Sequence, residues 1–410
     1  MYEWLETRHP GSIAKAVART DDRWRDEGST HERGTDMSTI YQSQSTPRRD
    51  GFRMPGEYEE QERTWILWPH RADVWRQGAK PAQRVFAEII RTIARFQPIT
   101  VGVNAEDYEA VCELFDKVEN VRVLLMQYND SWIRDPGPAF LVNDEGDVAL
   151  SHFHFNAYGG LIDGLYFPWD KEASLGLQIS QIEQVTRYRP DDFILEGGSF
   201  NCDGQGTVVT TEMCLLNEDR NPQYTKEQIE ELLGEYLGIE KVIWIKDGID
   251  PYETNGHVDD VACFSAPGEV CCMWTDDPDH KFYRECQEAY RVLSEATDAR
   301  GRKLKVHKVI MPSTSVYMTE EEASTIDLVE GSLPRTPEDA FEPSYLNFLP
   351  INGAVLVPQF GDPNDEQALE DIQAAYPDRE VIGIMTREII YGGGNIHCIT
   401  QQQPKAHRTA

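Results

Sequence analysis

The sequence predicts an α/β fold in which five similar units close into a ring. A hairpin–helix–strand pattern recurs along residues 138–385, and the hairpins at Ala139, Ser199 and His257 start about 60 residues apart. The two ends of the chain carry the two parts of a further unit. A fixed period indicates an array, and a unit split between the termini indicates that the array closes. The alternative is an ordinary mixed α/β domain.

Each hairpin consists of two short runs of β-branched and aromatic residues around a polar or glycine-containing turn. The first fits less cleanly than the others, because the helix signal that follows it, SLGLQISQIEQV, is weak. The four hairpins span 138–155, 199–216, 257–274 and 344–360.

A helix and a further strand follow each of the later hairpins. The periodicity predicts helices over 225–238, 282–296 and 365–376, and the strands KVIWIKD, KVHKVIMP and REVIGIM come after them. In the first of these helices one face collects the apolar residues Ile229, Leu232, Leu233 and Leu237.

The split unit uses both ends of the chain. NIHCITQQQP (395–404) supplies the C-terminal strand, and TWILWPH, a helix over residues 82–96 and the strand ITVGV supply the rest. Residues 1–50 lack sustained apolar periodicity, so they are predicted to be a disordered N-terminal extension. Residues 51–410 are predicted to form a single catalytic domain.

The composition restricts the partners. The 71 Asp and Glu residues against 39 Lys and Arg give a net charge of -32, which disfavours nucleic acid and anionic membranes. The chain has neither an apolar run of roughly 20 residues nor a secretory signal, so a cytoplasmic protein is expected. There is no CxxC pair, so a zinc ribbon or thioredoxin-like site is not supported.

Unusual polar residues fall where the hairpins begin, the positions expected to face the centre of a ring. The triple Gly at 392–394 is not followed by Lys, so phosphate binding is not supported, and these glycines indicate close approach of the backbone to a ligand. The four segments are DSWIRDPGP (130–138), ILEGGSFN (194–201), ETNGHVDD (253–260) and YGGGNIHC (391–398).

Cys398 is the candidate nucleophile, because a thiolate is strongly nucleophilic when a partner removes its proton or lowers its pKa. His257 is the candidate partner. His397 is expected on the opposite face of a strand from Cys398, so the two are not paired. The alternative is that Cys398 packs in the core and that His257 bonds only to backbone.

Carboxylates near a thiol suit a cationic electrophile. Period-two geometry places His257 and Asp259 on one side of a strand and Asp260 on the other. A planar guanidinium pairs bidentately with carboxylates, so Asp135 and Asp259 are expected to hold its nitrogens while Cys398 attacks its carbon.

In that arrangement His257 acts as general acid to the departing ammonia and as general base to the incoming water. For Asp135 the alternative is a structural ion pair with Arg134 or a turn role before Pro136.

The motifs WIRDPGPAF, EGGSFNCDGQG, ETNGHVDD and GGGNIHCITQQQP together resemble those of the agmatine deiminase family, within the guanidine-modifying enzyme superfamily. The resemblance runs from about Gly51 to Pro404. It implies a fivefold pseudosymmetric α/β propeller, a hydrolase that converts agmatine to N-carbamoylputrescine and ammonia in putrescine and polyamine biosynthesis, and no metal or organic cofactor.

The resemblance also implies roles for individual residues. Cys398 matches the nucleophile that forms a covalent amidino (thiouronium) intermediate, and His257 matches the general acid/base. Asp135 and Asp259 match the carboxylates that bind the guanidinium in that family. Glu253 matches an acid for the distal ammonium, and Trp132 matches an aromatic residue of the substrate channel, where contact with a cation is favourable.

Two competing functions stay open. An arginine or peptidyl-arginine deiminase requires a basic residue near the channel mouth for the substrate carboxylate, which Glu253 would repel. A non-catalytic propeller-like binding module predicts an ordinary Cys398. The expected partner is a small cationic substrate, and the resemblance suggests a homo-oligomer. The segment 319–342 is expected to be a surface loop or a lid.

Overall fold

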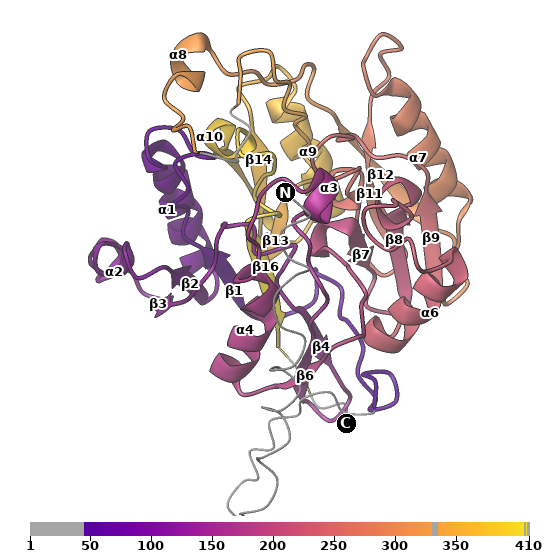
Figure 1. The fold of residues 1–410 in the computed structure, drawn as a ribbon. Helices are drawn as coiled ribbons and strands as arrows, with labels where there is room; N and C mark the ends of the chain where they lie inside the picture. The colour runs from indigo at the N-terminus through magenta and orange to yellow at the C-terminus, as the bar shows by residue number, and fades with distance from the viewer. Residues whose placement is uncertain (1–44, 330–334, 406, 408–410) are drawn as a thin grey trace, which may run out of the picture. The chain divides into compact units, whose positions relative to one another are not determined.

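The computed structural model describes residues 45–329, 335–405 and 407, all of which belong to one compact unit, Ile40–Ala410. The strands of these residues form five open sheets with mixed strand directions, interspersed with helices (Figure 1). The predicted α/β class is therefore confirmed. None of the helices in this part of the chain is long and apolar enough to cross a membrane.

Four sheets share one pattern. Two strands pair antiparallel through a hairpin, and the second strand pairs parallel with a third. A helix separates the second and third strands, since a parallel pair requires a long crossover. The hairpin–helix–strand prediction is confirmed in each of the four sheets.

The first two of these units cover residues 139–245. The first has β4 (Ala139–Val142), β5 (Val148–Ser151), α3 (Gly160–Asp163), η1 (Glu172–Ser174), α4 (Leu175–Glu183) and β6 (Thr186–Tyr188). The second has η2 (Gly197–Ser199), β7 (Phe200–Cys202), β8 (Thr207–Thr211), α5 (Glu212–Leu215), α6 (Lys226–Leu237) and β9 (Lys241–Ile245).

The next two cover residues 258–390. The third has η3 (Val258–Asp260), β10 (Ala262–Ala266), β11 (Glu269–Trp274), α7 (Tyr283–Glu295) and β12 (Lys305–Ile310). The fourth has α8 (Glu320–Ala323), β13 (Leu349–Ile351), β14 (Ala354–Gln359), α9 (Asp365–Ala375), β15 (Glu380–Met385) and α10 (Arg387–Ile390).

The fifth sheet joins the two ends of the chain. β16 (Thr400–Pro404) pairs antiparallel with β1 (Gln61–Leu67), and β1 pairs parallel with β2 (Ile99–Val103) across α1 (Lys80–Ala94). The predicted pairing of the terminal segments is confirmed. The sheet then extends beyond the prediction through α2 (Tyr108–Phe115) to a fourth strand, β3 (Val121–Leu125).

Local sequence explains these elements. Each of the four hairpins turns at a glycine with positive φ, a conformation that costs a residue with a Cβ atom steric energy: Gly146, Gly206, Gly268 and Gly353. The second unit's helix α6 begins with a capping box between Thr225 and Gln228 and ends at Gly238 in the left-handed region.

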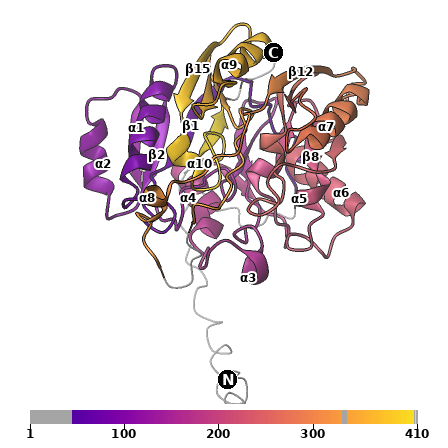
Figure 2. The ribbon, with the colours of Figure 1, turned by 90° about the horizontal axis from the view of Figure 1, so that it is seen from above.

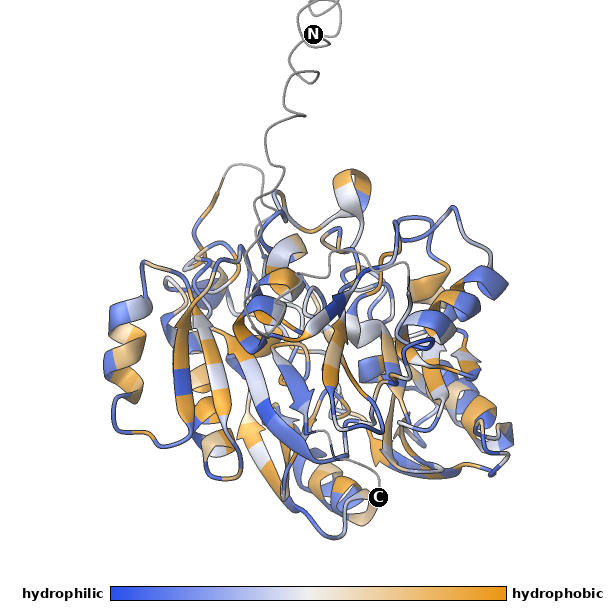
Figure 3. Cartoon of the chain, turned by 90° about the horizontal axis from the view of Figure 1, so that it is seen from below, coloured by the Kyte–Doolittle hydropathy of each residue, from blue (hydrophilic) through white to orange (hydrophobic). Residues whose placement is uncertain are grey.

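Buried side chains connect each unit to the next. One apolar cluster joins the first two units and another joins the second, third and fourth. Two more join the terminal sheet to the first unit and to the fourth. Helix α7 packs on β9 and β11 and helix α9 packs on β12 and β15, so each lies against the strands of two neighbouring units (Figure 2), and in Figure 3 both strands and helices carry hydrophobic and hydrophilic residues.

Two predicted segments lie partly outside the described residues. Of the extension predicted over residues 1–50, only residues 45–50 are described, and there Arg48 N donates to Glu235 O of α6 while Asp50 accepts from Tyr188. Of the segment 319–342, residues 330–334 are not described. Thr319 caps the short helix α8.

Candidate active site

The candidate residues come from the segments that directly precede the first strand of each unit. Because these short segments lead into neighbouring sheets at the same end of their first strands, five separate stretches of chain meet. They are Asp135 before β4, Glu196 before β7, His257 and Asp259 before β10, Asn347 before β13, and Cys398 before β16.

Gly198 marks the point where three of these side chains converge. A methyl group built on Gly198 would lie 2.6 Å from His257 Nδ1 and 3.0 Å from both Asp135 Oδ1 and Asp259 Oδ2. Its backbone N–H donates to Asp135 Oδ1 at 2.9 Å. Only a residue without a Cβ atom fits between the two carboxylates and the imidazole.

Cys398 is buried with its sulfur among polar groups. Its Sγ lies 3.1 Å from Asn347 Nδ2 and donates to Asp259 Oδ2 at 3.5 Å. Burial raises the pKa of the Cys398 thiol well above its ordinary value, and the charges of Asp259 and Asp260 add to this effect. The sulfur is therefore a neutral thiol at neutral pH.

His257 lies between two carboxylates. Its side chain is 1% exposed, with Nδ1 3.8 Å from Asp135 Oδ1 and Nε2 3.9 Å from Glu196 Oε2. Burial acts to lower its pKa, but the charge of Asp135 and the nearby Glu196 outweigh burial and hold the pKa well above its usual range. His257 is therefore an imidazolium, and neither ring nitrogen has a hydrogen-bond partner in the described residues.

Asp135 is positioned by backbone and by a phenol. The hydroxyl of Tyr158 donates to Asp135 Oδ2 at 2.8 Å, and the backbone N–H of Gly198 donates to Asp135 Oδ1. Burial raises the pKa of Asp135, although the imidazolium of His257 opposes this effect. The predicted alternative, an ion pair between Asp135 and Arg134, is absent from the described contacts, because Arg134 pairs with Glu57 instead.

His397 corrects the strand argument made from the sequence. The strand β16 begins only at Thr400, so His397 and Cys398 lie in a turn and alternation does not apply. His397 Nδ1 lies 2.9 Å from Asp259 Oδ2, and Nε2 lies 3.0 Å from both oxygens of Glu57. Cys398 and His397 therefore contact the same carboxylate.

The charges around His397 alternate in sign. Burial acts to lower the pKa of His397, but the two carboxylates that flank its ring raise it overall. Burial acts to raise the pKa of Asp259, and the hydrogen bond and charge of His397 lower it overall. Asp259 is therefore held ionised, with its Oδ1 atom free of hydrogen bonds within the described residues.

Asp259 and Asp260 do not lie in a strand, contrary to the sequence-based prediction. Residues Val258–Asp260 form a 3₁₀ turn before β10, so Asp259 and Asp260 do not point to opposite faces of a strand. Asn347 Nδ2 lies 3.2 Å from Asp259 Oδ2 and 3.2 Å from Asp260 Oδ1. Both acids therefore face the same amide.

Glu253 forms a bidentate ion pair with Arg335. Arg335 Nη1 contacts Oε1, Nη2 lies 3.0 Å from Oε2, and Nη2 also donates to the Gly392 carbonyl at 3.3 Å. Glu253 lines a cavity together with Asp250, Asp260, Phe341, Gly393 and Asn395. A basic residue, to which the sequence gave no role, therefore lies directly beside Glu253.

The three glycines at 392–394 lack side chains where Trp132, Cys398 and Glu253 approach their backbone closely. A methyl group on Gly394 would lie 2.8 Å from the Trp132 ring and 3.1 Å from Cys398 Sγ, and one on Gly393 would lie 1.7 Å from Glu253 Oε2. Trp132 is 7% exposed and stacks on Trp75 with ring centroids 5.2 Å apart. The loop thus places Trp132 beside the sulfur.

Several residues of the site have no role in the sequence-based prediction. Glu196 opens the EGGSFN motif, and this position at the start of a hairpin was its only signal. Asn347 occupies the equivalent position in the fourth unit, where the local sequence carries no such motif. The remaining contributors that carried no signal are Glu57, Tyr158, Cys214 and Arg335.

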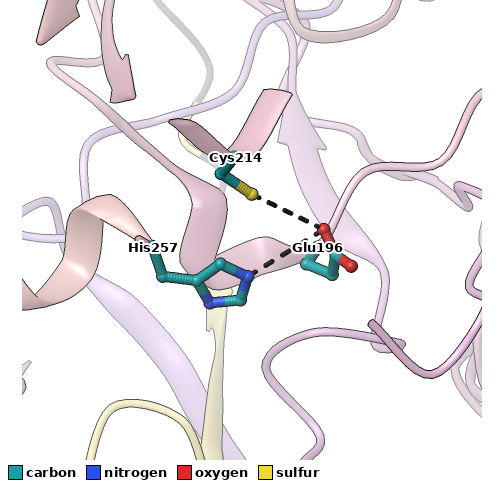
Figure 4. Close-up of side chains that lie close together, drawn as sticks. All are labelled: Glu196, Cys214 and His257. Atoms are coloured by element: carbon teal, nitrogen blue, oxygen red, sulfur yellow. Dashed lines mark hydrogen bonds and ion pairs between the residues drawn. The ribbon is translucent and has the colours of Figure 1, made fainter. Parts of the chain in front are cut away.

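One group of side chains in the described residues has the geometry to hold a metal ion. Glu196, Cys214 and His257 each offer one ligand atom, and these atoms lie within 4.8 Å of one another (Figure 4). Arg220 Nε donates to the other oxygen of Glu196 at 2.6 Å.

Comparisons with known proteins agree with one another. The model of the Porphyromonas-type peptidyl-arginine deiminase family matches residues 53–404. A solved structure described as agmatine deiminase of Enterococcus faecalis catalysing its reaction is 52% identical, with a TM-score of 0.86 over 89% of this chain and 98% of that one.

Two further relatives carry the same name. The agmatine deiminase of Pseudomonas aeruginosa is 50% identical over 88% of this chain and 97% of its own. A C. jejuni agmatine deiminase, solved with substrate bound in a cysteine-to-serine variant, is 25% identical, with a TM-score of 0.74 over 87% of this chain and 97% of that one.

Proposed function

Because the chain belongs to the Porphyromonas-type peptidyl-arginine deiminase family, we propose that it hydrolyses agmatine to N-carbamoylputrescine and ammonia. The observation that carries the proposal is the convergence of Asp135, Asp259 and His257 on Gly198, with Cys398 bonded to Asp259. Two buried carboxylates, an imidazolium and a thiol suit a planar cation and its electrophilic carbon.

The substrate guanidinium binds between the carboxylates of Asp135 and Asp259. Asp259 is ionised and keeps Oδ1 free, and both acids are at most 3% exposed, so their charges act through a medium of low dielectric. The bound cation offsets the negative charges that raise the pKa of Cys398, and the thiolate forms beside the carbon that it attacks.

The reaction then passes through a covalent amidino intermediate on Cys398. Cys398 loses its thiol proton to solvent and its Sγ bonds to the central carbon, while the His257 imidazolium protonates one nitrogen; the carbon–nitrogen bond breaks and this nitrogen leaves as ammonia. The neutral imidazole then takes a proton from the attacking water. The carbon–sulfur bond breaks, and Cys398 is restored. Glu196 and Asp135 orient the ring of His257 from its two sides.

The distal end of the substrate decides between two activities. Glu253 provides a carboxylate for the ammonium of agmatine, and Trp132 lines the route beside Cys398. Arg335 neutralises Glu253 and presents a guanidinium to a carboxylate, which is the specific observation that favours arginine or peptidyl-arginine as an alternative substrate. The names of the close relatives favour agmatine.

The repeated sheets support a fivefold pseudosymmetric α/β propeller. Each unit shares a buried apolar cluster with the next, and the terminal unit shares one with both the first and the fourth. That cyclic order is the one a closed ring requires. The protein is proposed to act in the cytoplasm, in putrescine and polyamine biosynthesis, as a homo-oligomer that binds no nucleic acid.

Two measurements test the proposal. Ammonia release is measured with agmatine and with arginine, and agmatine is expected to give the higher kcat/KM. A higher kcat/KM for arginine would contradict the proposal that agmatine is the substrate. Rapid acid quenching followed by mass spectrometry is expected to show an amidino adduct on the peptide that contains Cys398. If the Cys398→Ala variant still hydrolyses agmatine, Cys398 is not the nucleophile.

A further inference from the structure

His257 faces a second cysteine that the reaction does not use. Cys214 Sγ lies 4.0 Å from Glu196 Oε2, and His257 Nε2 lies 3.9 Å from the same oxygen (Figure 4). All three side chains are at most 1% exposed, and Nε2 has no hydrogen-bond partner in the described residues. A thiol, a carboxylate oxygen and an unpartnered imidazole nitrogen therefore point at one another.

This combination of donors suits zinc. Zn²⁺ binds Cys sulfur, His nitrogen and carboxylate oxygen at about 2.0 to 2.3 Å, usually in a tetrahedron. The three ligand atoms already lie within 4.8 Å of one another, so their separations need to shorten by no more than roughly 1.3 Å to surround one ion. A water molecule completes the tetrahedron.

The surroundings also favour a divalent cation. Asp135 lies 3.8 Å from His257 Nδ1, the position of the outer carboxylate that commonly accepts the second N–H of a zinc-bound histidine. Arg220 donates a hydrogen bond to Glu196 Oε1, so Glu196 Oε2 is the oxygen available to bind the ion. Three negative charges surround the ion, on the Cys214 thiolate, Glu196 and Asp135. They balance the two positive charges of Zn²⁺ and the one of Arg220.

We propose that Glu196, Cys214 and His257 bind one zinc ion, and that this ion inhibits the enzyme. Binding forms Zn–S, Zn–N and Zn–O bonds and releases two protons to solvent, the thiol proton of Cys214 and the Nε2 proton of the His257 imidazolium. The metal occupies the Nε2 lone pair of His257, so the imidazole can no longer accept and return a proton. The site is an inhibitory one and not a cofactor site.

Cobalt reports the ligands directly, because a thiolate bound to Co²⁺ gives a charge-transfer absorption in the near ultraviolet. Metal-free protein titrated with Co²⁺ is expected to show this band at one equivalent. The band is expected to disappear in Cys214→Ser, and to persist in Cys398→Ala and in the matched control Cys202→Ser, whose cysteine is buried beside Met54. Zn²⁺ is expected to displace the cobalt.

Inhibition is measured separately and rests on the proposed function. Zn²⁺ is expected to inhibit agmatine hydrolysis by wild-type protein, with full recovery after EDTA. The inhibition constant is expected to rise at least about tenfold in Cys214→Ser, since loss of even an outer partner typically weakens metal binding by that factor. The cobalt band requires no turnover, so failure of the agmatine assignment leaves it unaffected.

A third measurement needs no variant. Zn²⁺ is expected to protect Cys214 of the wild-type protein from a small thiol reagent, as read by peptide mass spectrometry. The proposal is overturned if Cys214 is labelled equally with and without Zn²⁺. It is also overturned if the cobalt band survives in Cys214→Ser, or if the band is lost in Cys398→Ala, which would place the metal on the other cysteine.

Discussion

Replacement of His397 by Gln tests whether a buried cation holds the site together. His397 bonds to Asp259 and Glu57, and its side chain is 2% exposed. Burial acts to raise the pKa of Glu57, but His397 and Arg134 lower it from 4.5 to about 2. At about 1.4 kcal/mol per pKa unit, the ionised Glu57 contributes roughly 3 kcal/mol of stability at neutral pH.

The neutral variant loses the larger part of this contribution, so its free energy of unfolding is expected to fall by roughly 2 to 3 kcal/mol at pH 7. The folded pKa of Glu57 is depressed, so its contribution is present above pH 4.5 and is lost as the pH falls towards about 2. The stability difference between wild type and variant is therefore expected to narrow over that interval. Urea unfolding followed by tryptophan fluorescence at several pH values measures it.

His307→Gln is the matched control. His307 pairs with Glu269 at 2.7 Å, but Glu269 is 34% exposed, so loss of this pair is expected to cost at most about 1 kcal/mol. Equal destabilisation by the two substitutions would refute the argument for a charged buried network. The kcat/KM of His397→Gln is also expected to fall by about 10- to 100-fold, because Asp259 loses a charge-assisted hydrogen bond.

Three further results are expected. Gly198→Ala places a methyl group 2.6 Å from His257 Nδ1 and is expected to lower kcat by about 100-fold or more with circular dichroism unchanged; near-normal turnover would contradict the convergence on Gly198. Arg335→Ala frees Glu253 and is expected to raise the ratio of agmatine to arginine kcat/KM about tenfold, measured by ammonia release, whereas an unchanged ratio would mean that Arg335 does not meet the substrate. Because the pKa of Cys398 is raised, its alkylation by iodoacetamide without substrate is expected to keep accelerating above about pH 9, and a plateau below that pH would argue for a thiolate in the free enzyme.

The repeated unit was predictable because its signals are local. Hairpin turns, helical periodicity and β-branched runs appear within short windows, and four glycine turns occur in the structure where hairpins were predicted. The pairing of β16 with β1 followed from counting incomplete units at the two ends. The strand β3 carried no repeat signal, because it extends one sheet beyond the common pattern.

The sequence by itself determined the kinds of side chain at the starts of the hairpins, and so the candidate nucleophile Cys398 and the acids Asp135 and Asp259. The tertiary structure decided which of them touch. Alternation along a strand separated His397 from Cys398, but the backbone turns before β16 and both residues reach Asp259. The contact of Glu253 with Arg335 likewise joins residues 82 positions apart. Charge pairing across such distances depends on how the units pack, because no local pattern encodes which buried carboxylate meets which cation.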